Sequence, residues 1–298
     1  MNTVIKPQSA NKKEIKMNTQ PVGNKVKAFG VALRSFLLFF CLLLSMNFWF
    51  LLFHEGGHAL ADLSEGNVTK LLYAHPFTFA GFARPNFRDN VLNHAAGPVM
   101  GVLVSLLIFI PLWKRRSTTL LPLVMVLPWA AIGTGGSVSN IAWTGDYRQI
   151  IRLTGLPEVA IVIPGLVMLV IGIFLFLCLF PLLGLSPKDW RVLLVLPAAI
   201  LLWSGVSILV AHLFVPGSPI DMIYNEKTVV IWSAELNMLG YLLNAVVLAV
   251  IYLTLFRLIY PRLPSWLKSE TVLLTWKDLR IPALSAAACV IVGLILIH

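Results

Sequence analysis

The stretch that decides the fold runs from Gly30 to His58 and reads GVALRSFLLFFCLLLSMNFWFLLFHEGGH. Residues 30–53 contain one charged residue, Arg34, and a helix needs about 20 apolar residues to cross the hydrocarbon core of a bilayer. The run is too long for the core of a signal peptide, and no small-residue cleavage site ends it. We therefore expect a retained membrane-spanning helix that leads directly into residues 54–58, three of which are ionisable.

The rest of the chain repeats this apolar pattern. The 298 residues are 58% apolar and only 12% charged, which lies far outside the balance of soluble domains. Apolar stretches of spanning length occur at 30–53, 91–113, 119–143, 158–183, 190–214, 231–256 and 281–298. The sequence therefore predicts an all-α polytopic membrane protein with about seven transmembrane helices, embedded in a lipid bilayer.

The positive charge follows the expected connections between spans. Of the 23 Lys and Arg residues, 17 fall at the N-terminus and in every second connection, and 6 fall in the others. Because cytoplasmic connections carry the excess of Lys and Arg, the N-terminus is predicted to be cytoplasmic. This distribution accounts for the net charge of +10 and argues against nucleic acid as a partner. A multi-pass protein of a bacterial inner membrane is the favoured location.

The chain divides into three parts. Residues 1–27 are polar and rich in lysine, which predicts a flexible basic cytoplasmic tail. Residues 28–150 would form a core of three spans that carries the ionisable motif, and residues 151–298 would form an additional transmembrane helical bundle.

Two connecting features add detail to this plan. Residues 68–73 and 77–79 are rich in strand-forming side chains, so we expect a short β-hairpin after the first span, lying against the membrane. Residues 133–136, with the sequence GTGG, lack the Lys-Ser/Thr ending of a phosphate-binding loop. Their expected role is close helix packing or backbone flexibility.

The motif His54-Glu55-Gly56-Gly57-His58 has the spacing of a metal site. On a helix, His54 and His58 lie on one face a turn apart, as two ligands of one tetrahedral ion require. The carboxylate of Glu55 can then act as general base toward a water whose pKa is lowered by Zn²⁺. Ionisable groups are costly at membrane depth and are usually functional there.

A catalytic zinc site of this kind needs a third protein ligand. Asp146 is the first candidate, because two expected spans separate it from the first helix and it returns to the same membrane side. His94 opens the second span on that side and could ligate instead, although such a histidine more often orients a ligand. Glu65 is a weaker alternative. Asp146, His94 and Glu65 all stay open at this point.

Three segments resemble the site-2 protease family of intramembrane zinc metalloproteases. Residues 54–61 (HEGGHALA), followed by Gly66, are similar to the stretch around that family's zinc-binding motif. Residues 95–98 (AAGP) resemble the signature that opens its next core helix. Gly145-Asp146 resembles the family's Asp-Gly pair only in part, because Tyr147 follows the aspartate. The resemblance covers about residues 30–150.

The resemblance implies a zinc-dependent endopeptidase that cuts a membrane-anchored protein substrate. Glu55 would be catalytic, and His54, His58 and Asp146 would bind the metal. Three further residues are candidates for orienting a ligand or stabilising the oxyanion: His94, Asn140 and Glu235, the last because a carboxylate in an apolar helix normally faces the bundle interior or water.

Two questions stay open. The alternative function is a non-proteolytic scaffold, chaperone or transporter component derived from the same fold. In addition, active sites of this family usually face the cytosol, whereas the charge count places the end of the first span on the other side.

Overall fold

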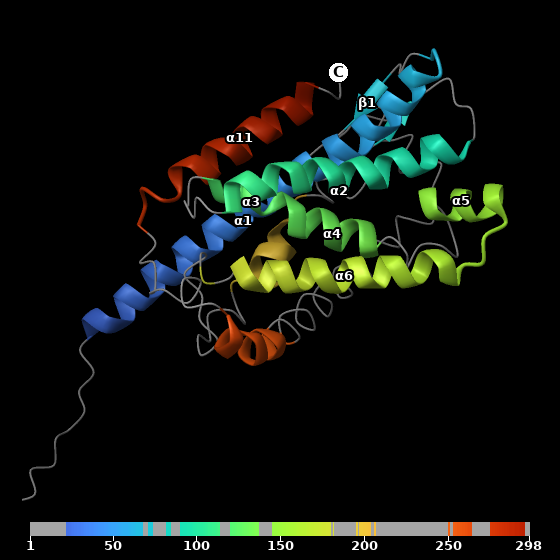
Figure 1. The fold of residues 1–298 in the computed structure, drawn as a ribbon. Helices are drawn as coiled ribbons and strands as arrows, with labels where there is room; N and C mark the ends of the chain where they lie inside the picture. The colour runs from blue at the N-terminus through green and yellow to red at the C-terminus, as the bar shows by residue number, and fades with distance from the viewer. Residues whose placement is uncertain are drawn as a thin grey trace, which may run out of the picture.

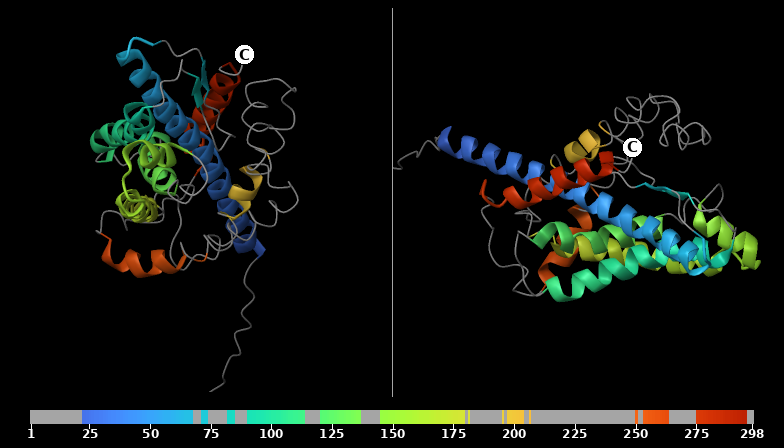
Figure 2. Two further views of the ribbon diagram at one scale, coloured as in Figure 1. Left: turned by 90° about the vertical axis from the view of Figure 1, so that its right-hand side faces the viewer. Right: turned by 90° about the horizontal axis from the view of Figure 1, so that it is seen from above.

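The computed structural model describes residues 22–67, 71–73, 82–84, 90–113, 120–136, 145–179, 253–263 and 275–295, with short pieces between 181 and 250. Within these residues the chain is predominantly helical, with one pair of short strands. Helices α2, α4 and α6 lie roughly along one direction, and α1 crosses them obliquely (Figure 1, Figure 2). The expected tail, 1–27, falls mostly outside the described residues.

Helix α1 (Val22–Ser64) is much longer than the expected span at 30–53. Residues 29–64 form one helix that is apolar and long enough to cross a membrane. The helix continues through the motif and ends in a Schellman turn, in which Gly66 adopts φ 76° and Asn67 N–H donates to the carbonyl of Asp62 at 2.9 Å. The two histidines therefore lie inside the helix, as their i, i+4 spacing predicts.

A small antiparallel sheet follows α1. Strand β1 (Leu71–Tyr73) pairs with β2 (Phe82–Arg84), with Leu71 opposite Arg84 and Tyr73 opposite Phe82. β1 lies in the first stretch where a strand was expected, whereas the second stretch, 77–79, lies outside the described residues. Both strands contact α1.

Helix α2 (Val91–Trp113) has the predicted bounds and runs back along α1 (Figure 1). Its first turn is capped by Asn90, whose Oδ1 accepts the N–H of Asn93 at 2.8 Å. α1 and α2 approach closely at Gly57, where an added Cβ would lie 2.8 Å from the carbonyl carbon of Ala96. This approach brings the start of α2 against the motif in α1.

Glycines also allow two later helices, α4 and α6, to approach each other closely. The expected span at 119–143 is instead a short turn, α3 (Leu121–Val124), followed by α4 (Val126–Gly136). A Cβ at Gly135 would lie 2.6 Å from the carbonyl oxygen of Gly165 in α6 (Val159–Leu179). This contact confirms the expected role of the GTGG segment in close helix packing. Helix α5 (Asp146–Thr154) lies between α4 and α6 in the chain.

The C-terminal helix α11 (Arg280–Ile295) packs against α1. Ser45 and Ser285 share a hydrogen bond of 3.0 Å across this contact, and Phe39 of α1 meets Phe176 of α6 edge to face, with centroids 6.0 Å apart. A 3₁₀ turn, η4 (Tyr260–Arg262), precedes α11. α1 thus contacts α2, α3, α4 and α11.

Three of the described helices are long and apolar enough to span a membrane: those within 29–64, 91–113 and 159–179. The apolar helices at 121–136 and 280–295 are shorter, about 24 Å each at 1.5 Å per residue. The expected spans at 190–214 and 231–256 lie mostly outside the described residues. The prediction of seven spans is therefore not supported by the described part of the chain, which has three candidates.

Candidate metal centre

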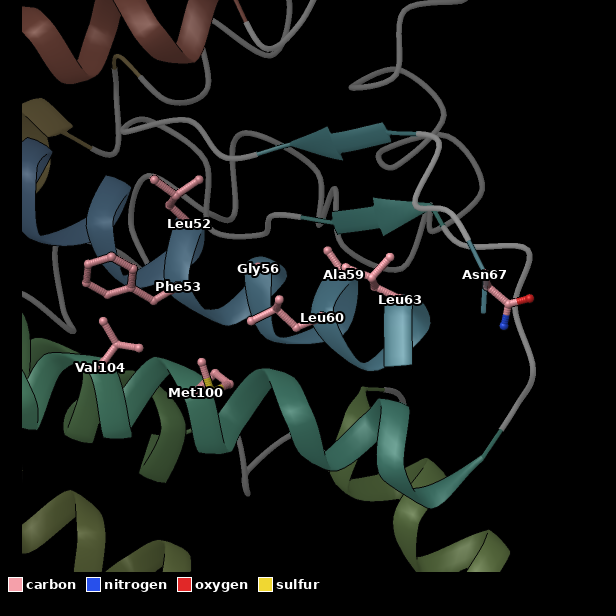
Figure 3. A pocket seen from close by; sticks show the side chains of 9 residues that line it. All are labelled: Leu52, Phe53, Gly56, Ala59, Leu60, Leu63, Asn67, Met100 and Val104. Atoms are coloured by element: carbon pink, nitrogen blue, oxygen red, sulfur yellow. The ribbon is translucent and has the colours of Figure 1, made fainter. Parts of the chain in front are cut away.

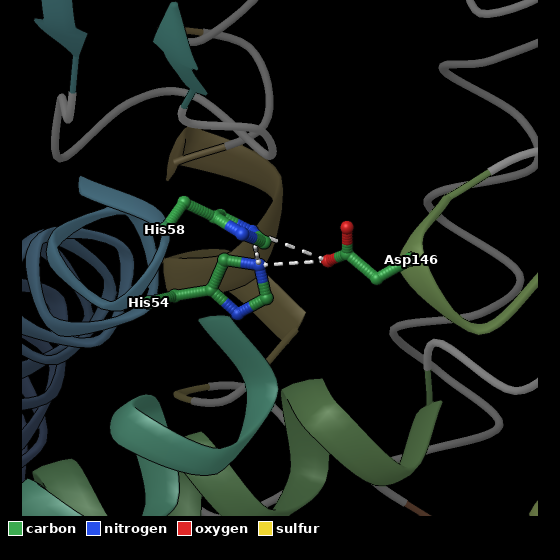
Figure 4. Close-up of side chains that lie close together, drawn as sticks. All are labelled: His54, His58 and Asp146. Carbon is green, nitrogen blue, oxygen red and sulfur yellow. Dashed lines mark hydrogen bonds and ion pairs between the residues drawn. The ribbon is translucent and has the colours of Figure 1, made fainter. Parts of the chain in front are cut away.

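His54 and His58, near the C-terminal end of α1, and Asp146, at the start of α5, converge on one point (Figure 4). The Nε2 atoms of the two histidines are 3.3 Å apart. Asp146 Oδ2 lies 3.1 Å from Nε2 of His54 and 3.5 Å from Nε2 of His58. The three residues predicted as metal ligands are thus brought together, although 92 positions separate His54 from Asp146 in the chain.

The spacing of these three atoms fits a tetrahedral ion. Ligand atoms bound at about 2.0–2.1 Å with tetrahedral angles lie about 3.3 Å from one another, and the three separations are 3.1, 3.3 and 3.5 Å. Two imidazole nitrogens and a carboxylate oxygen are also the donor types that zinc takes in catalytic sites. This group could hold a metal ion with one position left open.

The tautomer of His58 also suits a metal ligand. Its Nδ1 lies 2.7 Å from the backbone carbonyl oxygen of Asn93. A carbonyl oxygen only accepts hydrogen bonds, so the proton of the neutral ring is on Nδ1 and the lone pair is on Nε2. Nε2 is the atom that faces His54 and Asp146.

Gly97 leaves the space that the two imidazoles occupy. A Cβ at this position would overlap Nε2 of His58 and would lie 2.9 Å from Nε2 of His54. The residue belongs to the AAGP segment at the start of α2. Any side chain at residue 97 would therefore displace the histidines from each other or from Asp146.

Asp146 stands at the first position of α5, after Gly145, whose φ of 97° requires glycine. Its Oδ2 faces the two histidines of α1, and its Oδ1 lies 3.2 Å from Nδ1 of His94. Burial acts to raise the pKa of Asp146, but the hydrogen bonds with His54, His58 and His94 outweigh it and hold that pKa well below the usual range. The carboxylate is thus ionised, as a metal ligand must be.

The neighbouring Tyr147 stays neutral. Burial, followed by the charge of Asp146, raises the pKa of its hydroxyl to about 12.

The other predicted site residues lie in different surroundings. Glu55 is buried and close enough to His58 for an electrostatic interaction. His94 is buried beside Asp146 and outside the group of three. Glu65 accepts a hydrogen bond from Asn90 at the end of α1, away from the two histidines. Asn140 and Glu235 lie outside the described residues.

Sequence reasoning missed Asp62, a fully buried carboxylate on α1. Its Oδ1 accepts a hydrogen bond from Nδ2 of Asn93 at 2.6 Å. The signal was present, because Asp62 follows His54 and His58 at intervals of four residues and so lies on the same side of the helix.

An apolar cavity of about 510 Å³ lies on another side of α1 (Figure 3). Leu52, Gly56 and Leu63 line it from α1, and Met100 and Val104 line it from α2. Gly56 is two residues from His54, which turns it by about 200° around a helix of 3.6 residues per turn. The cavity is therefore separate from the metal centre.

Comparison of the chain with models of known protein families, with curated proteins and with solved structures yields no match.

Proposed function

We propose that the protein is an intramembrane or membrane-proximal zinc metalloprotease that hydrolyses peptide bonds of a membrane-anchored protein. The observation that carries this proposal is the convergence of His54, His58 and Asp146 at tetrahedral spacing beside the buried Glu55. These groups are presented by a helix that is long and apolar enough to cross a membrane.

Zinc is the proposed ion because of the donor set. Magnesium and calcium prefer oxygen ligands, whereas two imidazoles and one carboxylate are typical of catalytic zinc. A zinc ion held there would act as a Lewis acid toward a peptide carbonyl and lower the pKa of a water molecule.

Glu55 is the proposed general base. Its position directly after His54 places a carboxylate beside the ligands without making it one of them. It would accept the proton of the attacking water and deliver it to the leaving amine. His94 would hold Asp146 through Oδ1, so that Oδ2 stays directed at the two histidines.

The position of the site in α1 supports a membrane-anchored substrate. His58 precedes the helix end at Ser64 by six residues, which is about 9 Å along the axis. A scissile bond near the membrane surface could therefore reach the site. The substrate backbone must be extended there, because a helix hides its carbonyls, and the edge of the β1–β2 pair could bind it by β-addition.

The wider topology belongs to the same proposal. The apolar stretches at 190–214 and 231–256 would bring the number of spans to about seven, with the N-terminus in the cytoplasm and a bacterial inner membrane as location. The β1–β2 pair would lie against that membrane.

The test uses the full chain, purified in detergent and reconstituted with a panel of single-span membrane proteins. Mass spectrometry would search for new termini inside or next to their transmembrane segments. We expect about one zinc per chain by metal analysis, cleavage that a strong chelator abolishes, and restoration of cleavage by added zinc.

Glu55→Gln is the matched control for this assay. The amide cannot accept the water's proton, so this variant should retain zinc and lose turnover. Cleavage by metal-free protein, or by Glu55→Gln at the wild-type rate, would refute the proposed mechanism. A chain that holds zinc and cleaves none of the panel would favour the non-proteolytic alternative.

A further inference from the structure

Asp62 is a fully buried carboxylate, 0% exposed, one helical turn beyond His58 on α1. An ionised group is costly in such surroundings unless it is hydrogen-bonded, and within a membrane-spanning helix it marks a functional site by default. Asp62 is not in the group of three that converges on the metal position. Its Oδ1 instead accepts a 2.6 Å hydrogen bond from Nδ2 of Asn93.

Asn93 is equally buried and is held at three of its atoms. Its N–H donates to Oδ1 of the capping Asn90 at 2.8 Å. Its Nδ2 donates to Asp62, and its carbonyl oxygen accepts the Nδ1–H of His58 at 2.7 Å. The position of the carbonyl that selects the His58 tautomer is therefore coupled to the anchor that Asp62 provides.

A second hydrogen bond joins the C-terminal end of α1 to the start of α2. Asn90 donates from Nδ2 to Oε1 of Glu65. Asp62 and Glu65, at the C-terminal end of α1, thus bind Asn93 and Asn90 at the start of α2, and the two contacts are three residues apart on each side. These two hydrogen bonds fix the position of Asn93 along the axis of α2, and its rotation about that axis, relative to His58.

We propose that Asp62 is a positioning residue for His58. Acting through Asn93, it holds the carbonyl that keeps the proton on Nδ1 and the lone pair of Nε2 directed at the metal position. This inference rests on the metal centre of the proposed function. It adds that the centre depends on a carboxylate that does not touch the ion.

A simple clamp between α1 and α2 would use the same hydrogen bonds, so the two roles must be separated by measurement. Loss of a clamp lowers the stability of the fold and leaves the tautomer of His58 unchanged. Loss of a positioning residue changes the tautomer and the metal affinity while the protein stays folded.

The first experiment measures zinc affinity of the purified full chain by competition with a chromophoric chelator. Asp62→Ala should lower the affinity about 10–100-fold, the range found when the partner of a ligand is removed. Asp62→Asn should recover most of that loss, because its side-chain oxygen still accepts from Asn93. Glu158→Gln, at an exposed carboxylate that pairs with Arg148 at 3.4 Å, is the control and should not change the affinity.

If Asp62→Ala does not accumulate as folded protein, Asp62→Ser gives the same test. Serine keeps a polar group but is too short to reach Nδ2 of Asn93. Asn93→Ala should reproduce the loss, and the double variant with Asp62→Ala should be no worse than either single variant, because both act through one contact.

The second experiment reads the tautomer directly, by ¹⁵N NMR of histidine-labelled, metal-free protein at a pH at which the His58 ring is neutral. His58 should carry its proton on Nδ1 in the wild type and should populate both tautomers in Asp62→Ala. Zinc affinity within about twofold of wild type, additive losses in the double variant, or an unchanged tautomer would each overturn the inference. A chain that shows the expected pattern and yet cleaves no protein would refute the proposed protease and leave the role of Asp62 standing.

Discussion

Gly97 of α2 lies so close to His58 of α1 that a Cβ at residue 97 would be 2.6 Å from Cε1 of the imidazole. The same Cβ would lie 2.9 Å from Nε2 of His54. The glycine therefore sets the space in which the two histidines face each other. Helix packing and metal geometry are coupled at this point.

Gly97→Ala should lower zinc affinity by about 10–100-fold, because the added methyl group pushes one imidazole out of the cluster. The measurement is a zinc competition titration on the purified chain. Gly56→Ala is the matched control, since nothing lies within 4 Å of a Cβ at that position. If Gly97→Ala and the wild type bound zinc with equal affinity, the added methyl group would not displace either imidazole, and the prediction would be wrong.

Gly57→Ala should destabilise the fold. A Cβ at residue 57 would lie 2.8 Å from both the carbonyl carbon of Ala96 and Cβ of Met100, so α1 and α2 must separate. Such overpacking typically costs about 1–3 kcal/mol. The change is measured as a lower midpoint of thermal unfolding in detergent.

Gly56→Ala is again the comparison for Gly57→Ala. It places the same methyl group one residue away, in open space, where alanine favours the helix by up to about 1 kcal/mol. If both variants unfolded at the same temperature, close approach of the helices at Gly57 would not contribute to stability.

Much of this arrangement was predictable from the sequence, because the length of an apolar run and the spacing of residues in a motif can be read from it directly. The bounds of α2 follow from an apolar run between the capping Asn90 and a basic segment. The facing of His54 and His58 follows from the helical period. The count of spans also predicted that Asp146 would lie near the two histidines, and the structure brings the three side chains together.

Other features required the packed structure. The expected apolar span ended at residue 53, whereas α1 continues to Ser64 and packs closely against α2 at Gly57. The buried state of Asp62 depends on the partner Asn93, which lies 31 positions away in the chain. No local pattern reveals such a pair, since the contact arises only when α2 returns along α1.

The orientation of the site in the membrane is a separate prediction. The charge distribution predicts that the end of α1 lies on the non-cytoplasmic side. Pro85→Cys should therefore react with a membrane-impermeant maleimide in intact cells, and Arg115→Cys should react only after permeabilisation. The unsubstituted chain controls for its own three cysteines, Cys41, Cys178 and Cys289. The reverse labelling pattern would place the zinc site on the cytosolic face.

The last prediction distinguishes Asp146, the proposed metal ligand, from His94, which contacts that ligand. Asp146 presents Oδ2 to Nε2 of His54 at 3.1 Å and to Nε2 of His58 at 3.5 Å, and it presents Oδ1 to Nδ1 of His94 at 3.2 Å. The carboxylate thus stands between the ligand pair and His94. Asp146→Ala should abolish zinc binding and turnover, because two imidazoles alone leave the ion short of a protein ligand.

His94→Ala should behave differently, because it removes only a partner of Asp146. Zinc should remain bound with an affinity lowered about 10-fold or more, within the 10–100-fold range for such partners, and turnover should fall as Asp146 loses its fixed orientation. Metal analysis after dialysis against a weak chelator separates the two variants, with Arg148→Ala on the exposed side of α5 as control. Zinc lost from His94→Ala and retained in Asp146→Ala would instead indicate a three-histidine centre. In that case the contact between Asp146 and the histidines would be an ion pair that metal binding displaces.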